Sequence, residues 1–142
     1  MRILVSACLI GVNCRYNAEP VMKLDLEKLM ERHELIPVCP EQLGGLPTPR
    51  EPSEIQGDRV VMKSGRDVTE EYRRGAEETL RLAKLFGCNC ALMKERSPSC
   101  GFGEVYDGRF SGTLCAGNGV TAGLLSENGI EVFGESRADE LM

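Results

Sequence analysis

Near the start of the chain, an unbroken aliphatic run is followed closely by a cysteine, in the sequence Ile3-Leu4-Val5-Ser6-Ala7-Cys8. Its consecutive aliphatic residues are typical of a short strand buried on both faces of a parallel sheet. A cysteine follows soon after the end of this apolar run. The same order, a short apolar run and then a loop that carries a cysteine, recurs along the chain and sets the pattern for the rest.

Short apolar runs alternate with helical stretches throughout the chain. Further strands are predicted at residues 35–38, 90–93 and 130–133. Helices are predicted over residues 23–33, from Asp67 or Thr69 to about Phe86, and over residues 120–127. This alternation predicts an α/β fold in which helices cover both faces of a parallel sheet. We therefore expect a single-domain, three-layer Rossmann-like or flavodoxin-like fold over residues 1–142.

Two local signals refine this layout. Pro37 cannot donate a hydrogen bond to a neighbouring strand, so the second strand is expected at an edge of the sheet. The alternating stretch from Arg59 to Asp67, with a turn signal at Ser64-Gly65, predicts a small hairpin inserted before the long helix. The order of the strands is left open by a single sequence.

The composition narrows the classes of function. The chain has 142 residues and a net charge of −5, which disfavours binding to nucleic acids. No apolar run approaches the roughly 20 residues of a membrane span, and the apolar stretch after Met1 is too short for a signal peptide. We therefore expect a cytoplasmic protein, a monomer or a homodimer, with no membrane or nucleic-acid partner.

The cysteines are the most informative side chains. There are seven of them, which is many for a small protein of a reducing compartment, where disulfides are disfavoured. Cys8 follows the first predicted strand, Cys39 follows the second, and Cys100 lies in the loop after the third. Because parallel strands end at one edge of a sheet, where ligands bind, we expect these thiols to converge.

Converging thiolates can hold zinc or an iron–sulfur cluster. No C-x-x-C pair occurs, which weakens a zinc finger or ribbon, and ligands far apart in sequence suit a four-iron cluster better. With three protein ligands, one iron stays open for catalysis. Cys14 is a candidate fourth ligand. Glycines in these loops are expected to let the backbone approach the cluster; they are Gly44, Gly45, Gly101 and Gly103.

Other reactive side chains divide into one catalytic candidate and several structural ones. Glu41, two residues after Cys39, is the acid–base candidate, although a surface or helix-start carboxylate is the alternative. His33 ends a predicted helix and is given a structural role. The remaining cysteines are expected to be small buried hydrophobic residues; they are Cys88, Cys90 and Cys115.

The glycine-rich stretch from Gly101 to Gly119 precedes a predicted helix. A helix start of this kind is a candidate site for an anion or for a polar group of a substrate. No complete G-x-G-x-x-G or Walker pattern is present, and Asp107-Gly108 is a turn signal. Turn glycines are therefore the favoured reading over phosphate binding.

Three motifs carry a family resemblance. They are Ser-Ala-Cys-x-x-Gly-x-x-Cys-Arg-Tyr from Ser6, Pro-Val-Cys-Pro-Glu-Gln-Leu-Gly-Gly-Leu-Pro-Thr-Pro-Arg from Pro37, and Lys-Glu-x-Ser-Pro-Ser-Cys-Gly from Lys94. In these motifs the chain resembles the short, cysteine-rich bacterial domains that include the 2-thiouracil desulfidases, over nearly its whole length. One departure is that Asn17 and Ala18 stand where an acidic residue and a glycine are expected.

The resemblance implies an iron–sulfur enzyme that removes sulfur from a thiolated small molecule such as a thionucleobase. The [4Fe-4S] cluster of the family, with one iron not bound by protein, falls on Cys8, Cys39 and Cys100. The family's acid–base glutamate falls on Glu41 and a functional serine falls on Ser97. The thiocarbonyl sulfur would bind the open iron and stay as sulfide while the carbonyl forms. The alternatives are a cluster-based sulfur carrier or transferase, and a non-enzymatic iron–sulfur or zinc sensor or structural domain.

Overall fold

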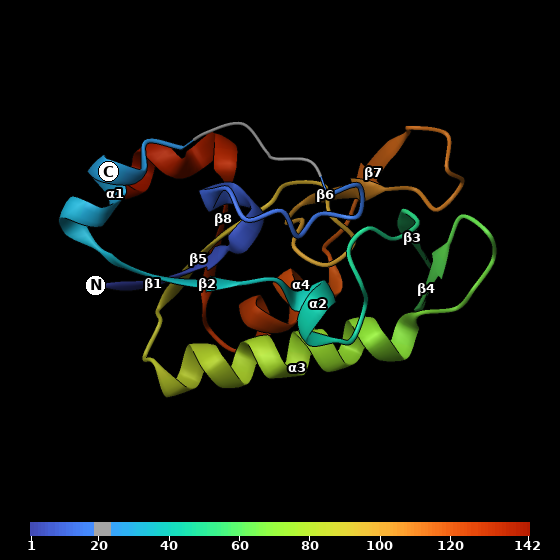
Figure 1. The fold of residues 1–142 in the computed structure, drawn as a ribbon, viewed down its shortest axis with the longest axis horizontal. Helices are drawn as coiled ribbons and strands as arrows, with labels where there is room; N and C mark the ends of the chain where they lie inside the picture. The colour runs from blue at the N-terminus through green and yellow to red at the C-terminus, as the bar shows by residue number, and fades with distance from the viewer. Residues whose placement is uncertain (19–23) are drawn as a thin grey trace.

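The computed structural model describes residues 1–18 and 24–142 (Figure 1). Within these residues the central sheet has four parallel strands in the order β2-β1-β5-β8. The strands are β1 (Arg2–Ser6), β2 (Glu34–Val38), β5 (Cys90–Met93) and β8 (Glu131–Gly134). They lie where the sequence predicts strands, and β2, which contains Pro37, is at the predicted edge. The order matches the flavodoxin-like arrangement, which confirms the predicted fold class.

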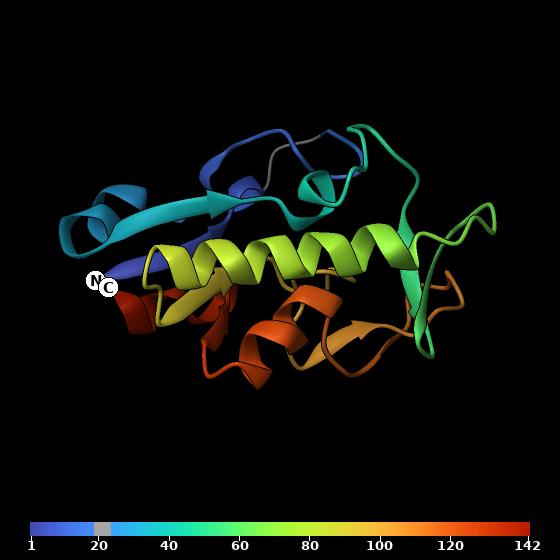
Figure 2. The same ribbon diagram turned by 90° about the horizontal axis from the view of Figure 1, so that it is seen from below.

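Helices cover both faces of the sheet and complete the three layers. They are α1 (Leu26–Arg32), α3 (Thr69–Leu85), α4 (Val120–Glu127) and the 3-10 helix η2 (Glu135–Leu141). Ile3 and Val5 of β1 pack with Leu29 of α1, whereas Leu4 between them packs with Ala83 of α3. Successive strand residues point to opposite faces, so both faces of β1 are buried. Figures 1 and 2 show α1 and η2 on one side of the sheet and α3 and α4 on the other.

The helix starts follow from capping chemistry. In α1, the carboxylate of Asp25 accepts a hydrogen bond from the backbone N–H of Lys28 at 3.1 Å, so this helix begins at Leu26. Lys23, its predicted first residue, lies outside the described residues. In α3, the carboxylate of Asp67 accepts from the backbone N–H of Thr69 at 2.9 Å. Acidic side chains stabilise the first turn of a helix. The predicted start of α3, at Asp67 or Thr69, is confirmed, and α1 begins at Leu26, inside the predicted range 23–33.

The predicted hairpin is present with different pairing. Strand β4 (Arg59–Met62) forms a ladder with β3 (Ser53–Gln56), which precedes it. The predicted partner residues after it make fewer bonds to β4, among them Met62 N–H to the Arg66 carbonyl oxygen at 2.8 Å. The turn lies at Gly57-Asp58, where Gly57 has φ of 63° and so suits a tight hairpin turn. The Ser64-Gly65 turn also forms, but an isolated bridge between Val61 and Asp67 is what remains there of the predicted pairing.

Short elements follow the sheet strands and were not predicted. They are η1 (Ala7–Ile10) after β1, α2 (Pro40–Leu43) after β2, and the hairpin of β6 (Glu104–Tyr106) and β7 (Leu114–Ala116) after β5. All of them start from the carboxyl edge of the sheet, where they build the surroundings of the cysteines. No helix in the described part of the chain is long and apolar enough to cross a membrane.

Candidate functional site

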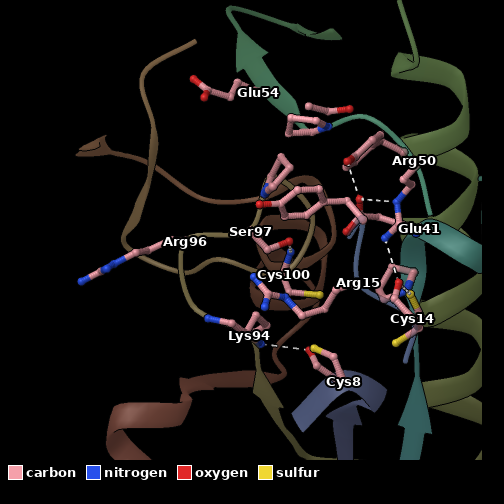
Figure 3. A pocket seen from close by; sticks show the side chains of 18 of the residues that line it. Cys8, Cys14, Arg15, Glu41, Arg50, Glu54, Lys94, Arg96, Ser97 and Cys100 are labelled. Carbon is pink, nitrogen blue, oxygen red and sulfur yellow. Dashed lines mark hydrogen bonds and ion pairs between the residues drawn. The ribbon is translucent and has the colours of Figure 1, made fainter. Parts of the chain in front are cut away.

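A pocket of about 430 Å³ lies at the carboxyl edge of the sheet (Figure 3). Its wall includes the last residues of two neighbouring strands, Ser6 of β1 and Val38 of β2, and Lys94 directly after β5. The pocket therefore opens at the point where ligands bind in open parallel sheets. The site residues predicted from the sequence all line it; they are Cys8, Cys14, Cys39, Glu41, Ser97 and Cys100.

The pairing of the strands brings the three predicted ligands together. Strand β1 lies between β2 and β5, so the loops after all three strands leave the sheet side by side. Cys8 lies in η1, Cys39 is the N-cap residue of α2, and Cys100 is in the loop after β5. Cys8 and Cys100 are buried, with exposed fractions of 8% and 5%. Thiols that are distant in sequence thus share one pocket.

Cys14 belongs to the same group of thiols. Its side chain is within hydrogen-bonding reach of both Cys8 and Cys39, and the Cys39 thiol donates to the Cys14 carbonyl oxygen at 3.7 Å. The hydrogen bond with Cys39 lowers the pKa of Cys14, but the hydrogen bond with Cys8 and burial outweigh it and raise the pKa to about 11. The hydrogen bond with Cys14 and burial raise the pKa of Cys39, and burial raises that of Cys100 to about 12. Without metal these three thiols keep their protons at neutral pH, and metal binding releases them.

The donor set fits a cluster of several irons. Within the described residues, no three His, Cys, Asp or Glu side chains are arranged to hold a single metal ion. A zinc ion needs its sulfur ligands about 2.3 Å away on one centre, whereas a cluster distributes its thiolate ligands over different irons. The three cysteines that line this pocket are of the residue type that such a cluster takes as ligands.

Glu41 lies beside the thiols in the first turn of α2. Its Oε1 atom accepts a hydrogen bond from the hydroxyl of Tyr72 at 2.6 Å and an ion-paired bond from Nε of Arg50 at 3.3 Å (Figure 3). The Arg50 side chain is 2% exposed and that of Glu41 is 17% exposed. The carboxylate is therefore held on the protein side by two donors, and its pocket side is accessible.

Ser97 has a different environment. Its Oγ atom accepts hydrogen bonds from the backbone N–H groups of Ser99 and Cys100, each at 3.0 Å. A serine hydroxyl has two acceptor positions and one donor, so these bonds leave the O–H of Ser97 to donate. The same bonds fix the backbone of Cys100. Ser97 can therefore present a proton to a ligand in the pocket and orient a candidate metal ligand at the same time.

The start of α4 is occupied by the Cys100 loop, so it does not serve as the candidate site for an anion or a polar substrate group, which the sequence had already made the less favoured interpretation. The first backbone N–H groups of this helix donate to carbonyl oxygens of the loop: Val120 to Pro98, and Thr121 to Ser99, each at 2.9 Å. A Cβ atom at Gly119 would lie 2.5 Å from the carbonyl oxygen of Ser99. The helix start thus stabilises the loop and does not hold a ligand.

Comparison with known proteins identifies the family. A family model described as 2-thiouracil desulfurase matches residues 3–137. The chain belongs to the 2-thiouracil desulfurase family. This confirms the resemblance that the three motifs carry.

Two relatives cover nearly the whole chain. An uncharacterized protein of Bacillus subtilis (strain 168), YbbK, is 43% identical over 150 residues, which span 99% of each sequence. A solved structure is named [4Fe-4S]-dependent thiouracil desulfidase TudS. It is 48% identical to this chain, superposes with a TM-score of 0.93, and the match covers 99% of this chain and 94% of that one.

Gly44 serves helix packing, which differs from the role that the sequence predicts for this loop glycine. Gly44, Gly45, Gly101 and Gly103 are absent from the pocket wall. A Cβ atom at Gly44 would lie 1.9 Å from the carbonyl oxygen of Glu71 in α3. Gly44 therefore lets α2 approach α3 and does not make room for a cluster.

Several functional candidates were missed by the sequence reasoning. Tyr72 gave no signal beyond its place in a predicted helix, and Arg50 ended a motif without an assigned role. Basic side chains also line the pocket; they are Arg15, Lys63, Lys94 and Arg96. Lys94 pairs with Glu135 at 2.8 Å. Arg15 and Lys94 stand in the quoted motifs but were given no role, and Lys63 and Arg96 occupy positions that no motif specifies.

The remaining cysteines and the histidine lie away from the pocket. Cys88 and Cys90 are buried as predicted, whereas Cys115 is exposed on β7, which corrects that prediction. Strand β7 is exposed at Cys115 and Ala116 and half-buried at Leu114. His33 ends α1, and its Nε2 atom lies 2.6 Å from the carbonyl oxygen of Leu141, in keeping with a structural role.

Proposed function

We propose that this chain is an iron–sulfur-cluster-dependent desulfidase that converts the thiocarbonyl of a thiouracil-like molecule to a carbonyl. The observation that carries the proposal is the meeting of Cys8, Cys39 and Cys100 with Glu41 and Ser97 in one pocket. Family membership supports the reaction, and the related structure named as a [4Fe-4S]-dependent thiouracil desulfidase supports the cofactor.

Cys8, Cys39 and Cys100 would hold a [4Fe-4S] cluster in which one iron has no protein ligand. Such a cluster, when bound, supplies a Lewis-acidic iron that polarises a thiocarbonyl and takes up its sulfur as sulfide. Cys14 stays a candidate fourth ligand, because it lines the same pocket and its carbonyl oxygen accepts a hydrogen bond from the Cys39 thiol at 3.7 Å. The rest of the reaction is assigned to side chains of the chain itself.

Glu41 is proposed as the acid–base residue. With Oε1 bound to Tyr72 and Arg50, the carboxylate has a second oxygen to accept the proton of a water molecule that attacks the thiocarbonyl carbon. As the carbonyl forms, the hydroxyl on this carbon loses its remaining proton, and both protons of the water leave with the sulfide. Ser97, whose hydroxyl is left to donate, would orient the substrate or stabilise charge that develops on it.

The pocket suits a small molecule. Its volume of about 430 Å³ lies in the range of small-ligand sites. We therefore infer a thiolated small molecule as the substrate and no nucleic acid. We also infer that residues 1–142 act as one cluster-binding domain, in a cytoplasmic monomer or homodimer.

The proposal is tested by assaying the anaerobically reconstituted protein for uracil and sulfide release from 2-thiouracil. Glu41→Gln is expected to lower kcat by about 100-fold or more while the iron content stays that of the wild type. Glu27→Gln, at an exposed position of α1, is the matched control with unchanged kcat. An iron-loaded wild type without turnover on thiolated bases, or a Glu41→Gln variant with unchanged kcat, would contradict the proposal and favour the sensor or carrier alternatives.

A further inference from the structure

Helix α2 meets α3 backbone to backbone. A Cβ atom at Gly75 of α3 would lie 1.9 Å from the carbonyl oxygen of Pro40, and one at Gly44 equally close to that of Glu71. No side chain fits between the two helices at this point. The residue one turn before Gly75 on α3 is Tyr72, which this close contact brings within reach of α2.

Tyr72 is a buried donor with a fixed ring. It is 2% exposed and packs in a core cluster with Leu46, Val60, Met62 and Val68. Its hydroxyl donates to Oε1 of Glu41 at 2.6 Å. Burial, followed by the charge of Glu41, raises the pKa of Tyr72 well above its ordinary value, so the hydroxyl keeps its proton and always donates.

Arg50 approaches the same oxygen from another segment. Its Nε donates to Oε1 of Glu41 at 3.3 Å, while its Nη2 donates to the carbonyl oxygen of Cys14 at 3.0 Å. Its Nη1 donates to the carbonyl oxygen of Pro47 and to the hydroxyl of Thr48, each at 3.0 Å. All three guanidinium nitrogens are engaged in a nearly inaccessible position, so this cation cannot move without breaking several bonds.

Tyr72 and Arg50 both donate to Oε1 of Glu41, and neither of these two residues donates to its Oε2. Rotation of the carboxylate would break two charge-assisted hydrogen bonds at once, one of them to a ring locked in the core. We propose that Tyr72 and Arg50 are positioning residues that fix the Glu41 carboxylate with Oε2 presented to the pocket. This inference rests on the role proposed above for Glu41.

The residue types at these positions support a chemical role over a purely structural one. A phenylalanine at position 72 would fill the same core space, and a lysine at position 50 would supply the same charge. Only the hydroxyl and the planar guanidinium also fix the angle of the carboxylate. Positioning of this kind affects the rate of the chemical step and leaves substrate binding unchanged.

The first test is the kinetics of Tyr72→Phe in the cluster-loaded enzyme. We expect kcat to fall about 10- to 100-fold with KM and iron content unchanged, as for loss of a supporting partner of an active-site group. Thr79→Val is the matched control, because Thr79 is also a fully buried hydroxyl on α3 but lies outside the pocket. It should leave kcat and KM as in the wild type.

A double-mutant cycle separates positioning from a general structural effect. In a Glu41→Gln background, Tyr72→Phe is expected to lower kcat less than about 2-fold further, because a residue that acts through Glu41 has little left to support. Arg50→Lys should show the same dependence on Glu41. An equal loss of kcat with and without Glu41, or an unaffected Tyr72→Phe enzyme, would overturn the proposal.

Crystal structures of the purified wild type and the Tyr72→Phe variant give a readout that does not depend on turnover. We expect the Glu41 carboxylate to rotate away from Arg50 or to occupy several orientations in the variant. If the wild type has no desulfidase activity, the proposed function fails, and these structures still decide the present proposal. A carboxylate in the same single orientation in both proteins would contradict it.

Discussion

The two cysteine loops that flank β1 are held in place by different means. The loop after β2, which carries Cys39 and Glu41, is held by residues far away in sequence, namely Tyr72 and Gly75 of α3. The loop after β5, which carries Cys100, is held by its own Ser97 and by the backbone of the helix start at residues 119–121. One loop depends on side chains of a distant helix and the other on local and backbone hydrogen bonds.

The difference shows that a sequence motif need not include all of the residues that hold its loop in place. The Cys100 loop carries part of its own support in Ser97, and the rest comes from backbone N–H groups at the start of α4. The Cys39 loop has a longer motif, but the groups that orient Glu41 include one outside it. Substitutions in α3 should therefore damage the site as severely as substitutions in the motif.

The largest effect is expected from Gly75→Ala. The new Cβ atom would lie 1.9 Å from the carbonyl oxygen of Pro40, so α2 must move away from α3 and take Cys39 and Glu41 with it. The free energy of unfolding should fall by about 3 kcal/mol, measured by urea denaturation. Gly123→Ala in α4 is the control, because its Cβ atom would meet Asn118 at an ordinary 3.6 Å. Equal stability of the two variants would contradict the backbone contact.

A smaller effect is expected from Gly119→Ala, which perturbs the Cys100 loop. Its Cβ atom would lie 2.5 Å from the carbonyl oxygen of Ser99, so the loop must shift relative to α4. The free energy of unfolding should fall by about 2 kcal/mol and the iron content should decrease. Gly117→Ala, with a nearest contact of 3.4 Å to Val105, should retain both properties. Full iron content in the Gly119 variant would show that the contact does not position Cys100.

Ser97→Ala should have a still smaller effect on stability. It removes the acceptor of the N–H groups of Ser99 and Cys100, which costs about 1 kcal/mol in a partly exposed loop. Urea denaturation measures this loss, with Ser126→Ala at an exposed position of α4 as the control. A loss confined to kcat, with stability unchanged, would assign Ser97 to the chemistry alone.

The smallest effect concerns the start of α3 and depends on pH. Hydrogen bonds with Thr69, followed by that with Arg59, lower the pKa of Asp67 from 3.8 to about 2. A lowered pKa in the folded state stabilises the fold above the ordinary pKa, and this contribution is lost as pH falls from about 4 to about 2. The urea midpoint of Asp67→Asn should therefore change less between pH 5 and pH 2 than that of the wild type. Parallel curves would show that Asp67 is not linked to folding.

Much of the framework could be predicted from the sequence. Unbroken apolar runs such as Ile3-Leu4-Val5 mark buried parallel strands, and the shared edge of such strands predicts that Cys8, Cys39 and Cys100 meet. Acidic residues indicated the start of α3, and apolar spacing indicated α1 without fixing its first residue. These features depend on residues close together in sequence or on a general rule of sheet topology.

The errors and omissions all depend on tertiary contacts. The pairing of β4 with β3 was missed, because the short turn at Gly57-Asp58 competes with an equally plausible one at Ser64-Gly65. Gly44 was assigned to the cluster, although its neighbour is the backbone of α3. The bond from Tyr72 to Glu41 joins residues 31 positions apart, and no local pattern encodes it.

Cys8, Cys39 and Cys100 are proposed to hold an iron–sulfur cluster together. The most direct measurement is the iron and sulfide content and the visible absorption of anaerobically reconstituted wild type, of the variants Cys8→Ser, Cys39→Ser and Cys100→Ser, and of the control Cys115→Ser, which changes an exposed cysteine. We predict about four irons per chain and a broad visible band in the wild type and the control, both lost in each of the three variants. A colourless protein, a single bound zinc, or a full cluster in any of the three variants would contradict the account.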